Sequence, residues 1–176
     1  MMAQRKVVLF IAATLDGYIA TQDHELDWLF KVEGENDNGT KEFMDTVDTV
    51  IMGRTTYDWL MAQEIEFPYK DKECYVFTKS PKTDTEYVTF TNEDVAQFTE
   101  KLKSKSGKNI WLVGGGELLF AFLEGKLVDE MIVTIAPVLL GSGIPLFRQN
   151  SFRTGLRLSN VTRLNQFVAL RYEVIK

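Results

Sequence analysis

The sequence contains a single cysteine, Cys74, and a single histidine, His24. One cysteine cannot form an internal disulfide, so nothing in the chain calls for an oxidising compartment. Cys74 lies within the apolar run ECYVF and His24 within a polar loop, which favours a buried structural thiol over a catalytic thiol–imidazole pair. With so few of these ligands, a zinc site of the usual kind is not expected.

The sequence has no excess of positive charge: it contains 20 Lys and Arg residues and 25 Asp and Glu residues, which gives a net charge of −5. The lysine-rich stretch KLKSKSGK, at 101–108, fits the solvated end of a helix. Long apolar runs are scarce too: the run at 7–13 is too short to span a bilayer, and no clean signal-peptide cleavage site follows it. We therefore expect a cytoplasmic protein with a small-molecule substrate, and neither nucleic acid nor a membrane as its partner.

What the sequence does contain is the composition and pattern of one α/β domain. At 176 residues, 45% hydrophobic and 26% charged, the chain suits a single globular domain over residues 1–176. The runs at 130–140, 155–164 and 166–175 are strand-like, with no helix between them. Before them, strand-like runs alternate with helix-like segments: strands at 6–13, 49–53, 73–78, 86–90 and 109–113, helices at 38–47, 54–63, 91–102 and 116–126. This pattern predicts a mainly parallel sheet continued by antiparallel C-terminal strands.

Glycines and polar side chains follow three of these strands, and parallel α/β sheets bind their ligands at such strand ends. The strand at 109–113 runs into three glycines, residues 114–116, which let a backbone approach a ligand closely. The helix that starts near Glu117 adds free N–H groups and the positive end of a helix dipole. Both features suit a pyrophosphate, although a glycine run before a helix also occurs where elements simply pack closely.

Two further strand ends carry residue types that bind anions. GRTT, at 53–56, combines a glycine, a planar guanidinium fork and two hydroxyls at the start of a helix. TKS, at 78–80, forms a compact turn with one cation and two hydroxyls. GRTT alone is explained equally well by a turn and helix cap, and TKS alone is more often a plain turn. The three together, each at a predicted strand end, indicate a dinucleotide with an extra phosphate, such as NADP.

These stretches resemble the dihydrofolate reductase-like superfamily, and more closely its branch around the reductase domain of bacterial riboflavin biosynthesis. Taken together the matching stretches are specific, and they span nearly the whole chain in family order. They are AATLDGYIA (12–20), VIMGRTTYD (50–58), VFTKSP (76–81), WLVGGGELLFAFL (111–123) and DEMIVTIAPVLLGSGIPLF (129–147). No deaminase-like stretch precedes them, so the chain resembles the stand-alone reductase-like members.

The resemblance implies a single-domain, three-layer fold with an eight-stranded, mainly parallel sheet and with NADPH across its carboxyl edge. It places Arg54 and Thr55 near the 2′-phosphate and the pyrophosphate, and Lys79 and Ser80 beside the adenosine phosphate. The candidate cofactor-binding residues are Ala13, Gly17, Ile19, Gly53, Arg54, Thr55, Thr56, Thr78, Lys79, Ser80, Val113, Gly114, Gly115, Gly116, Glu117 and Leu118. The C-terminal strands pair subunits in this branch, which implies a homodimer.

Two carboxylates are candidate catalytic residues. Asp16 lies in the LDGYIA loop, which the resemblance places at the nicotinamide end, although an Asp-Gly turn explains it equally. Counting back from IMGR by the family spacing leads to Asp37, which could instead cap the following helix. Trp28 and Thr134 are the candidate substrate-binding residues, and Trp28 also fits a core tryptophan. Leu119 stands where dihydrofolate reductases have a tyrosine, which argues against true dihydrofolate reduction.

The resemblance and the three strand ends predict an NADPH-dependent reductase that transfers a hydride to a small heteroaromatic, pyrimidine-like or pterin-like substrate. It would be similar to the reductases of 5-amino-6-(5-phosphoribosylamino)uracil. Hydride transfer needs few acid–base residues from the protein, because the cofactor carries the hydride and the site mainly orients two reactants. Two other hypotheses stay open: a weak dihydrofolate reductase and a non-catalytic nucleotide-binding module.

Overall fold

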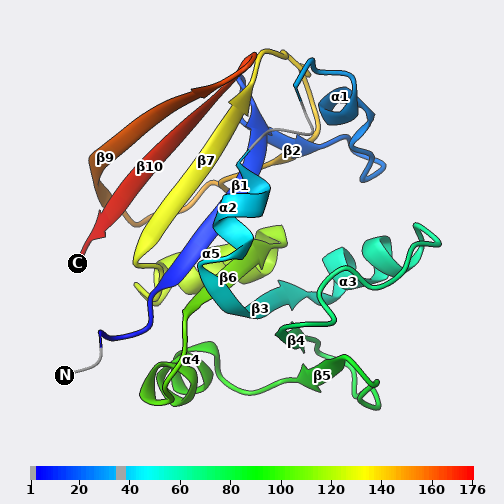
Figure 1. Ribbon diagram of the computed structural model, residues 1–176, viewed down its shortest axis with the longest axis vertical. Coiled ribbons are helices and arrows are strands. Elements are labelled where there is room, and N and C mark those ends of the chain that lie inside the picture. The colour runs from blue at the N-terminus through cyan, green and yellow to red at the C-terminus, as the bar shows by residue number, and fades with distance from the viewer. Residues whose placement is uncertain (1–2, 35–38) are drawn as a thin grey trace.

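One sheet organises the chain in a computed structural model of the protein, which describes residues 3–34 and 39–176 (Figure 1). From one edge to the other its eight strands are β5 (Val88–Thr91), β4 (Glu73–Phe77), β3 (Val47–Gly53), β6 (Asn109–Gly114), β1 (Val7–Thr14), β7 (Glu130–Ala136), β10 (Phe167–Ile175) and β9 (Gly155–Leu164). The predicted strand-like runs all form strands of this sheet. The expected α/β fold is therefore confirmed.

Four helices cover the two faces of the sheet: α2 (Thr40–Met44) and α3 (Arg54–Met61) on one, α4 (Val95–Ser104) and α5 (Gly116–Glu124) on the other. Successive residues of a strand point to opposite faces, which is why both faces have a core. Leu9 of β1 packs with Phe122 of α5, whereas its neighbour Val8 packs with Phe43 of α2. The three-layer architecture follows from this alternation. No helix in the described part of the chain is long and apolar enough to cross a membrane.

The direction of one strand differs from the prediction. β7 pairs parallel with β1, from Val8 opposite Glu130 to Thr14 opposite Ala136, whereas the pattern suggested that the antiparallel part begins there. The helix α5 explains the difference, because it carries the chain back across the sheet between β6 and β7. The antiparallel part is β10, which runs opposite to its neighbours β7 and β9.

The long polar loop predicted after β1 contains two short elements that hold it in place. β2 (Tyr18–Ala20) pairs with β8 (Ile144–Pro145), and α1 (Asp27–Phe30) follows β2. Trp28 of α1 is buried against Ala136 at the end of β7. The chain that leaves β1 is therefore folded over the carboxyl edge of the sheet, where Figure 1 shows β2 and α1 together.

Candidate functional site

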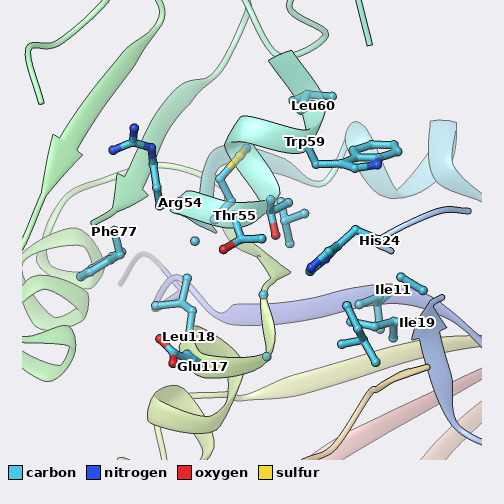
Figure 2. Close-up of a pocket in the computed structure, with 18 of the residues that line it drawn as sticks. Ile11, Ile19, His24, Arg54, Thr55, Trp59, Leu60, Phe77, Glu117 and Leu118 are labelled. Atoms are coloured by element: carbon cyan, nitrogen blue, oxygen red, sulfur yellow. The ribbon is translucent and has the colours of Figure 1, made fainter. Parts of the chain in front are cut away.

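A cleft of about 1060 Å³ opens at the carboxyl edge of the sheet (Figure 2). The ends of four strands line it, together with the starts of α3 and α5, the start of α4 (Val95–Ser104) with the residues before it, and parts of the segments 19–29 and 143–148. Its volume is at the upper end of the range for small-molecule sites, so it suits a ligand larger than a single drug-sized compound. The three strand ends 53–56, 78–80 and 113–118 meet in its wall, with Gly114 alone among their residues set back from it.

The glycine run between β6 and α5 has a backbone that other residues tolerate poorly. Gly114 has a φ of 125° and Gly115 a φ of 103°, values that L-residues rarely adopt. A Cβ atom on Gly115 would lie 3.4 Å from Thr56 Oγ1 and 3.7 Å from the Cα atom of Gly53. The glycines therefore permit close packing of two strand ends, and this packing brings the starts of two helices to one cleft.

Of the three helices that start at the cleft, α3 and α5 lack side-chain caps. The N-cap residues are Gly53 for α3 and Gly115 for α5, and neither supplies a capping hydrogen bond. By contrast, α4 is capped by Asp94, whose carboxylate accepts hydrogen bonds from the N–H groups of Ala96 and Gln97, each at 3.0 Å. The first N–H groups of α3 and α5 are therefore free of side-chain caps, and helix starts of this kind bind anions.

Two basic side chains beside these helix starts are engaged in ion pairs. Arg54 Nε donates to both carboxylate oxygens of Asp58, at 2.9 and 3.0 Å, and another guanidinium N–H lies 3.4 Å from Thr78 Oγ1. Lys79 Nζ lies 3.4 Å from Glu117 Oε2, which joins the end of β4 to the first turn of α5. Because both pairs are open to solvent, their net stabilisation is small, and a phosphate can replace the acidic partners.

The opposite half of the cleft is apolar, and of its residues the sequence had singled out Ile19 alone, as a candidate for cofactor binding. Figure 2 shows Trp59 and Leu60 of α3 on one side of this half, and Ile11 of β1 and Ile19 of β2 on the other. We call the part of the cleft that is lined by Ile11, Ile19, Trp59 and Leu60 the apolar half. Leu26, Leu29 and Tyr69 also line the cleft. One signal could have found Trp59 and Leu60, because they lie one helical turn after the predicted pair 55–56 on the same helix.

His24 also belongs to this half, and its side chain points into the cleft in Figure 2. Its backbone has a φ of 64°, a left-handed conformation that is uncommon outside glycine. The sequence placed His24 in a polar loop and assigned it no role. Only the pairing of β2 with β8, which folds the loop back, brings this imidazole to the cleft.

Asp16, a predicted catalytic candidate, is held in a turn and does not line the cleft. Its carboxylate accepts hydrogen bonds from Thr14 Oγ1 at 2.6 Å, Gly141 N at 2.8 Å and Leu140 N at 3.1 Å. These bonds lower the pKa of Asp16, and the bond from Thr14 is the largest cause. Gly17, which follows it with a φ of 89°, also lies outside the cleft wall. This arrangement suits the alternative of a structural Asp-Gly turn that ties β1 to the loop after β7.

Other candidates also stand away from the cleft wall. Ala13 is fully buried in the core beneath α5. Trp28 and Thr134 are buried as well, and neither the indole N–H of Trp28 nor the hydroxyl of Thr134 has a hydrogen-bond partner in the described part of the chain. Asp37 lies outside the described residues.

The sheet order, the helices on both faces and the cleft at the carboxyl edge define the class of the protein, a three-layer α/β protein with a dihydrofolate reductase-like fold. Its family follows from a separate match. The chain belongs to the family of the RibD C-terminal domain, whose family model matches residues 5–170.

Two proteins of Bacillus subtilis (strain 168) are similar over most of the chain. The uncharacterized protein YwjB is 50% identical over 170 residues, which cover 96% of this chain and 98% of YwjB. The uncharacterized protein YyaP is 36% identical over 169 residues, which cover 89% of this chain and 88% of YyaP. Neither name states an activity.

Solved structures resemble the fold over nearly its whole length. A protein of Shewanella sp. PV-4, assigned provisionally to riboflavin biosynthesis, has a TM-score of 0.87 at 30% identity over 97% of this chain and 99% of its own. The diaminohydroxyphosphoribosylaminopyrimidine deaminase/5-amino-6-(5-phosphoribosylamino)uracil reductase of Thermotoga maritima has a TM-score of 0.73 at 16% identity, over 97% of this chain and 56% of that one. The second likeness shows the fold alone. Together with the family match, these structures identify the fold of the RibD C-terminal domain.

Proposed function

We propose that the protein is an NADPH-dependent reductase of the cytoplasm that transfers a hydride to a small heteroaromatic, pyrimidine-like or pterin-like substrate. The observation that carries the proposal is the meeting of two uncapped helix starts, those of α3 and α5, in one large cleft with an apolar second half. Membership of the RibD C-terminal domain family supports a reductase-like role, since the Thermotoga maritima protein of the same fold is named as a reductase.

The other half of the cleft, which we call the polar half, is formed by the strand ends 53–56, 78–80 and 113–118, and its residues fit the phosphates of such a cofactor. The backbone at 115–116 lines the cleft without side chains, and the first N–H groups of α5 would donate to a pyrophosphate there. The guanidinium of Arg54 and the ammonium of Lys79 would exchange their acidic partners for a 2′-phosphate, which offers more acceptor oxygens than a carboxylate. Thr78 lies 3.4 Å from Arg54 and would add a hydroxyl.

When bound, NADPH supplies a hydride to an electron-poor carbon of a C=N or C=O bond. The apolar half would hold the acceptor against the nicotinamide and exclude water. The nitrogen or oxygen atom of the reduced bond then needs a proton, and His24 presents an imidazole, the group that exchanges protons most readily near neutral pH. Because His24 is exposed, water can return the proton that it donates.

Calorimetry of NADPH and NADH binding tests the cofactor assignment. We expect Arg54→Ala to weaken NADPH binding about tenfold, the scale of a lost charged hydrogen bond, with little change for NADH. Arg163→Ala, which removes an exposed arginine of β9, is the control and should change neither. Equal losses for both cofactors would disprove the 2′-phosphate assignment. If millimolar NADPH does not bind at all, the proposed function fails.

A panel of substrates separates the reductase from its alternatives. NADPH oxidation with a pyrimidine or a pterin supports the proposal, whereas turnover confined to dihydrofolate would indicate a dihydrofolate reductase. NADPH binding without turnover of any compound would indicate a nucleotide-binding module.

We also propose that the protein is a homodimer paired through β9 and β10. Four exposed apolar residues of this hairpin share one of its faces: Leu156, Leu158, Val161 and Val168. Leu156 and Leu158 stand opposite Val174 and Tyr172, which pack against the core on the α5 side of the sheet. The hairpin therefore extends the apolar face of the sheet beyond the helices, and no helix covers it in Figure 1. A second copy of the chain would bury this face.

Sedimentation of the purified protein tests the dimer. Leu158→Lys should shift it to the monomer, because a lysine there would be buried without a partner. Thr162→Lys is the matched control, since Thr162 stands opposite Ala169 on the other face of the hairpin. A wild-type monomer at micromolar concentration would disprove this proposal.

A further inference from the structure

We infer that the substrate enters the apolar half as a planar ring that carries no phosphate and no other formal charge. The inference rests on the proposed function, because it names the substrate class of that reductase. It departs from the reaction for which the Thermotoga maritima protein is named, whose substrate bears a phosphoribosyl group.

The walls of the apolar half are suited to a flat, uncharged molecule. Ile11 and Ile19 form one side, and the indole of Trp59 with Leu60 forms the other (Figure 2). Trp59 is partly exposed, so its ring has surface left for a ligand. A heteroaromatic ring between these walls would pack on aliphatic groups and on the indole, which favours planar ligands.

Charged side chains of the cleft gather in its other half. Arg54 and Lys79 stand at the ends of β3 and β4, and Glu117 lies in the first turn of α5. Arg148 lies against the start of α5, since its Cδ atom would be 3.9 Å from a Cβ atom on Gly116. The residues outside the described ranges, Met1, Met2 and the ENDN stretch at 35–38, include no Lys, Arg or His. His24 is thus the one basic side chain that the apolar half receives.

An anionic group in the apolar half would lose its hydration without gaining a cationic partner. A buried phosphate needs basic side chains or a helix start to replace its water, and in the proposed complex the two helix starts face the cofactor. The single, exposed His24 would have to bind this phosphate and also supply the proton for the reduced bond. The same reasoning disfavours carboxylates, so the site selects the ring and gains nothing from an anionic tail.

Two pairs of compounds test this selection. The first is 5-amino-6-ribosylaminouracil with and without its 5′-phosphate, and the second is dihydrofolate with its dimethyl ester, in which both tail carboxylates are uncharged. Calorimetry on protein saturated with NADP⁺ measures each affinity without turnover. We expect the uncharged member of at least one pair to bind. In neither pair should the charged member bind more than threefold tighter than the uncharged member. A larger gain in affinity from the charged group in either pair would overturn the inference. So would the failure of every one of the four compounds to bind. Failure to load NADP⁺, measured first, would contradict the proposed function instead.

Substitutions at Trp59 test the ring surface. Trp59→Ala should weaken the uncharged ring about tenfold, while Trp59→Phe should stay within threefold of the wild type. Met61→Ala is the control, because Met61 is an exposed apolar residue of the same helix that does not line the cleft. All three variants should bind NADPH as the wild type does. Unchanged ring binding by Trp59→Ala would overturn the inference. So would a phosphate-dependent gain that Arg148→Ala abolishes, because the phosphate would then lie at the start of α5.

Discussion

Two adjacent glycines at the cleft differ in what they tolerate. Gly115 has a φ of 103°, and a Cβ atom there would lie 3.4 Å from Thr56 Oγ1, whereas a Cβ atom on Gly116 would come no closer than 3.9 Å to Arg148. We expect Gly115→Ala to lower the free energy of unfolding by about 2 kcal/mol through backbone strain. Gly116→Ala, in a helical position, should change it by no more than ~0.5 kcal/mol. Urea unfolding of both variants measures these changes, and equal losses of unfolding free energy would contradict the assignment of strain to Gly115.

His24 can be tested without disturbing its backbone. Asn adopts left-handed conformations such as the φ of 64° at His24 more readily than most residues do, so His24→Asn removes the imidazole and keeps the turn. If His24 donates the proton, kcat should fall about a hundredfold while the affinity for NADPH stays the same. Unchanged kcat at neutral pH would exclude His24 as the proton donor.

Among the elements, helix α4 differs from α3 and α5 in how it begins. The cap from Asp94 stabilises α4, whereas the starts of α3 and α5 are glycines without a capping bond. We expect Asp94→Ala to cost about 1 kcal/mol of unfolding free energy, because two N–H groups lose their acceptor. Asp94→Asn, which keeps an acceptor, should recover most of it. Neither variant should change NADPH binding by calorimetry; a tenfold loss would show that the start of α4 belongs to the cofactor site.

The strands show where local patterns suffice and where they do not. Alternating and continuous apolar runs located the strands of the main sheet, because burial of a strand depends on its own residues. The same patterns misjudged the direction of β7, since direction depends on where α5 returns the chain. They also missed β2 and β8, whose pairing joins residues more than a hundred positions apart.

At the scale of the whole molecule, ionic contacts at the amino edge of the sheet join distant parts of the chain. Asp129 accepts hydrogen bonds from Lys103 Nζ at 2.6 Å, from the backbone N–H of Val7 at 2.8 Å, and from Lys176. Burial opposes the ionisation of Asp129, but these bonds outweigh it and lower its pKa from the ordinary value of 3.8. β1, α4, β7 and the C-terminus are thus linked through one carboxylate.

This lowered pKa predicts a dependence of stability on pH. A carboxyl group with a lowered pKa in the folded state stabilises the protein above its ordinary value, and this contribution is lost as the pH falls through the lowered value. We expect the free energy of unfolding to fall below about pH 4, with a slope of up to ~1.4 kcal/mol per pH unit for each such carboxylate. Urea unfolding between pH 7 and pH 3 measures it.

Asp129→Asn is the variant for this measurement. It should be less stable at pH 7 and show a shallower slope in acid, since Asn cannot take up the proton. Glu93→Gln, which alters an exposed carboxylate paired with Lys101, is the matched control and should keep the wild-type slope. An unchanged slope in Asp129→Asn would show that other carboxylates set the acid stability.

The sequence by itself determined the fold class, the strands of the main sheet and the three strand ends that line the polar half of the cleft. Each of these depends on local features: apolar periodicity, glycine before a helix, and basic or hydroxyl residues directly after a strand. Only the tertiary structure decided the rest. The hydrogen bond that Gly141 N donates to the Asp16 carboxylate spans 125 positions, and no local pattern shows that this carboxylate is held outside the cleft. The meeting of His24, Ile11 and Trp59 likewise depends on three segments brought together by the sheet, which is why the apolar half became visible only in the fold.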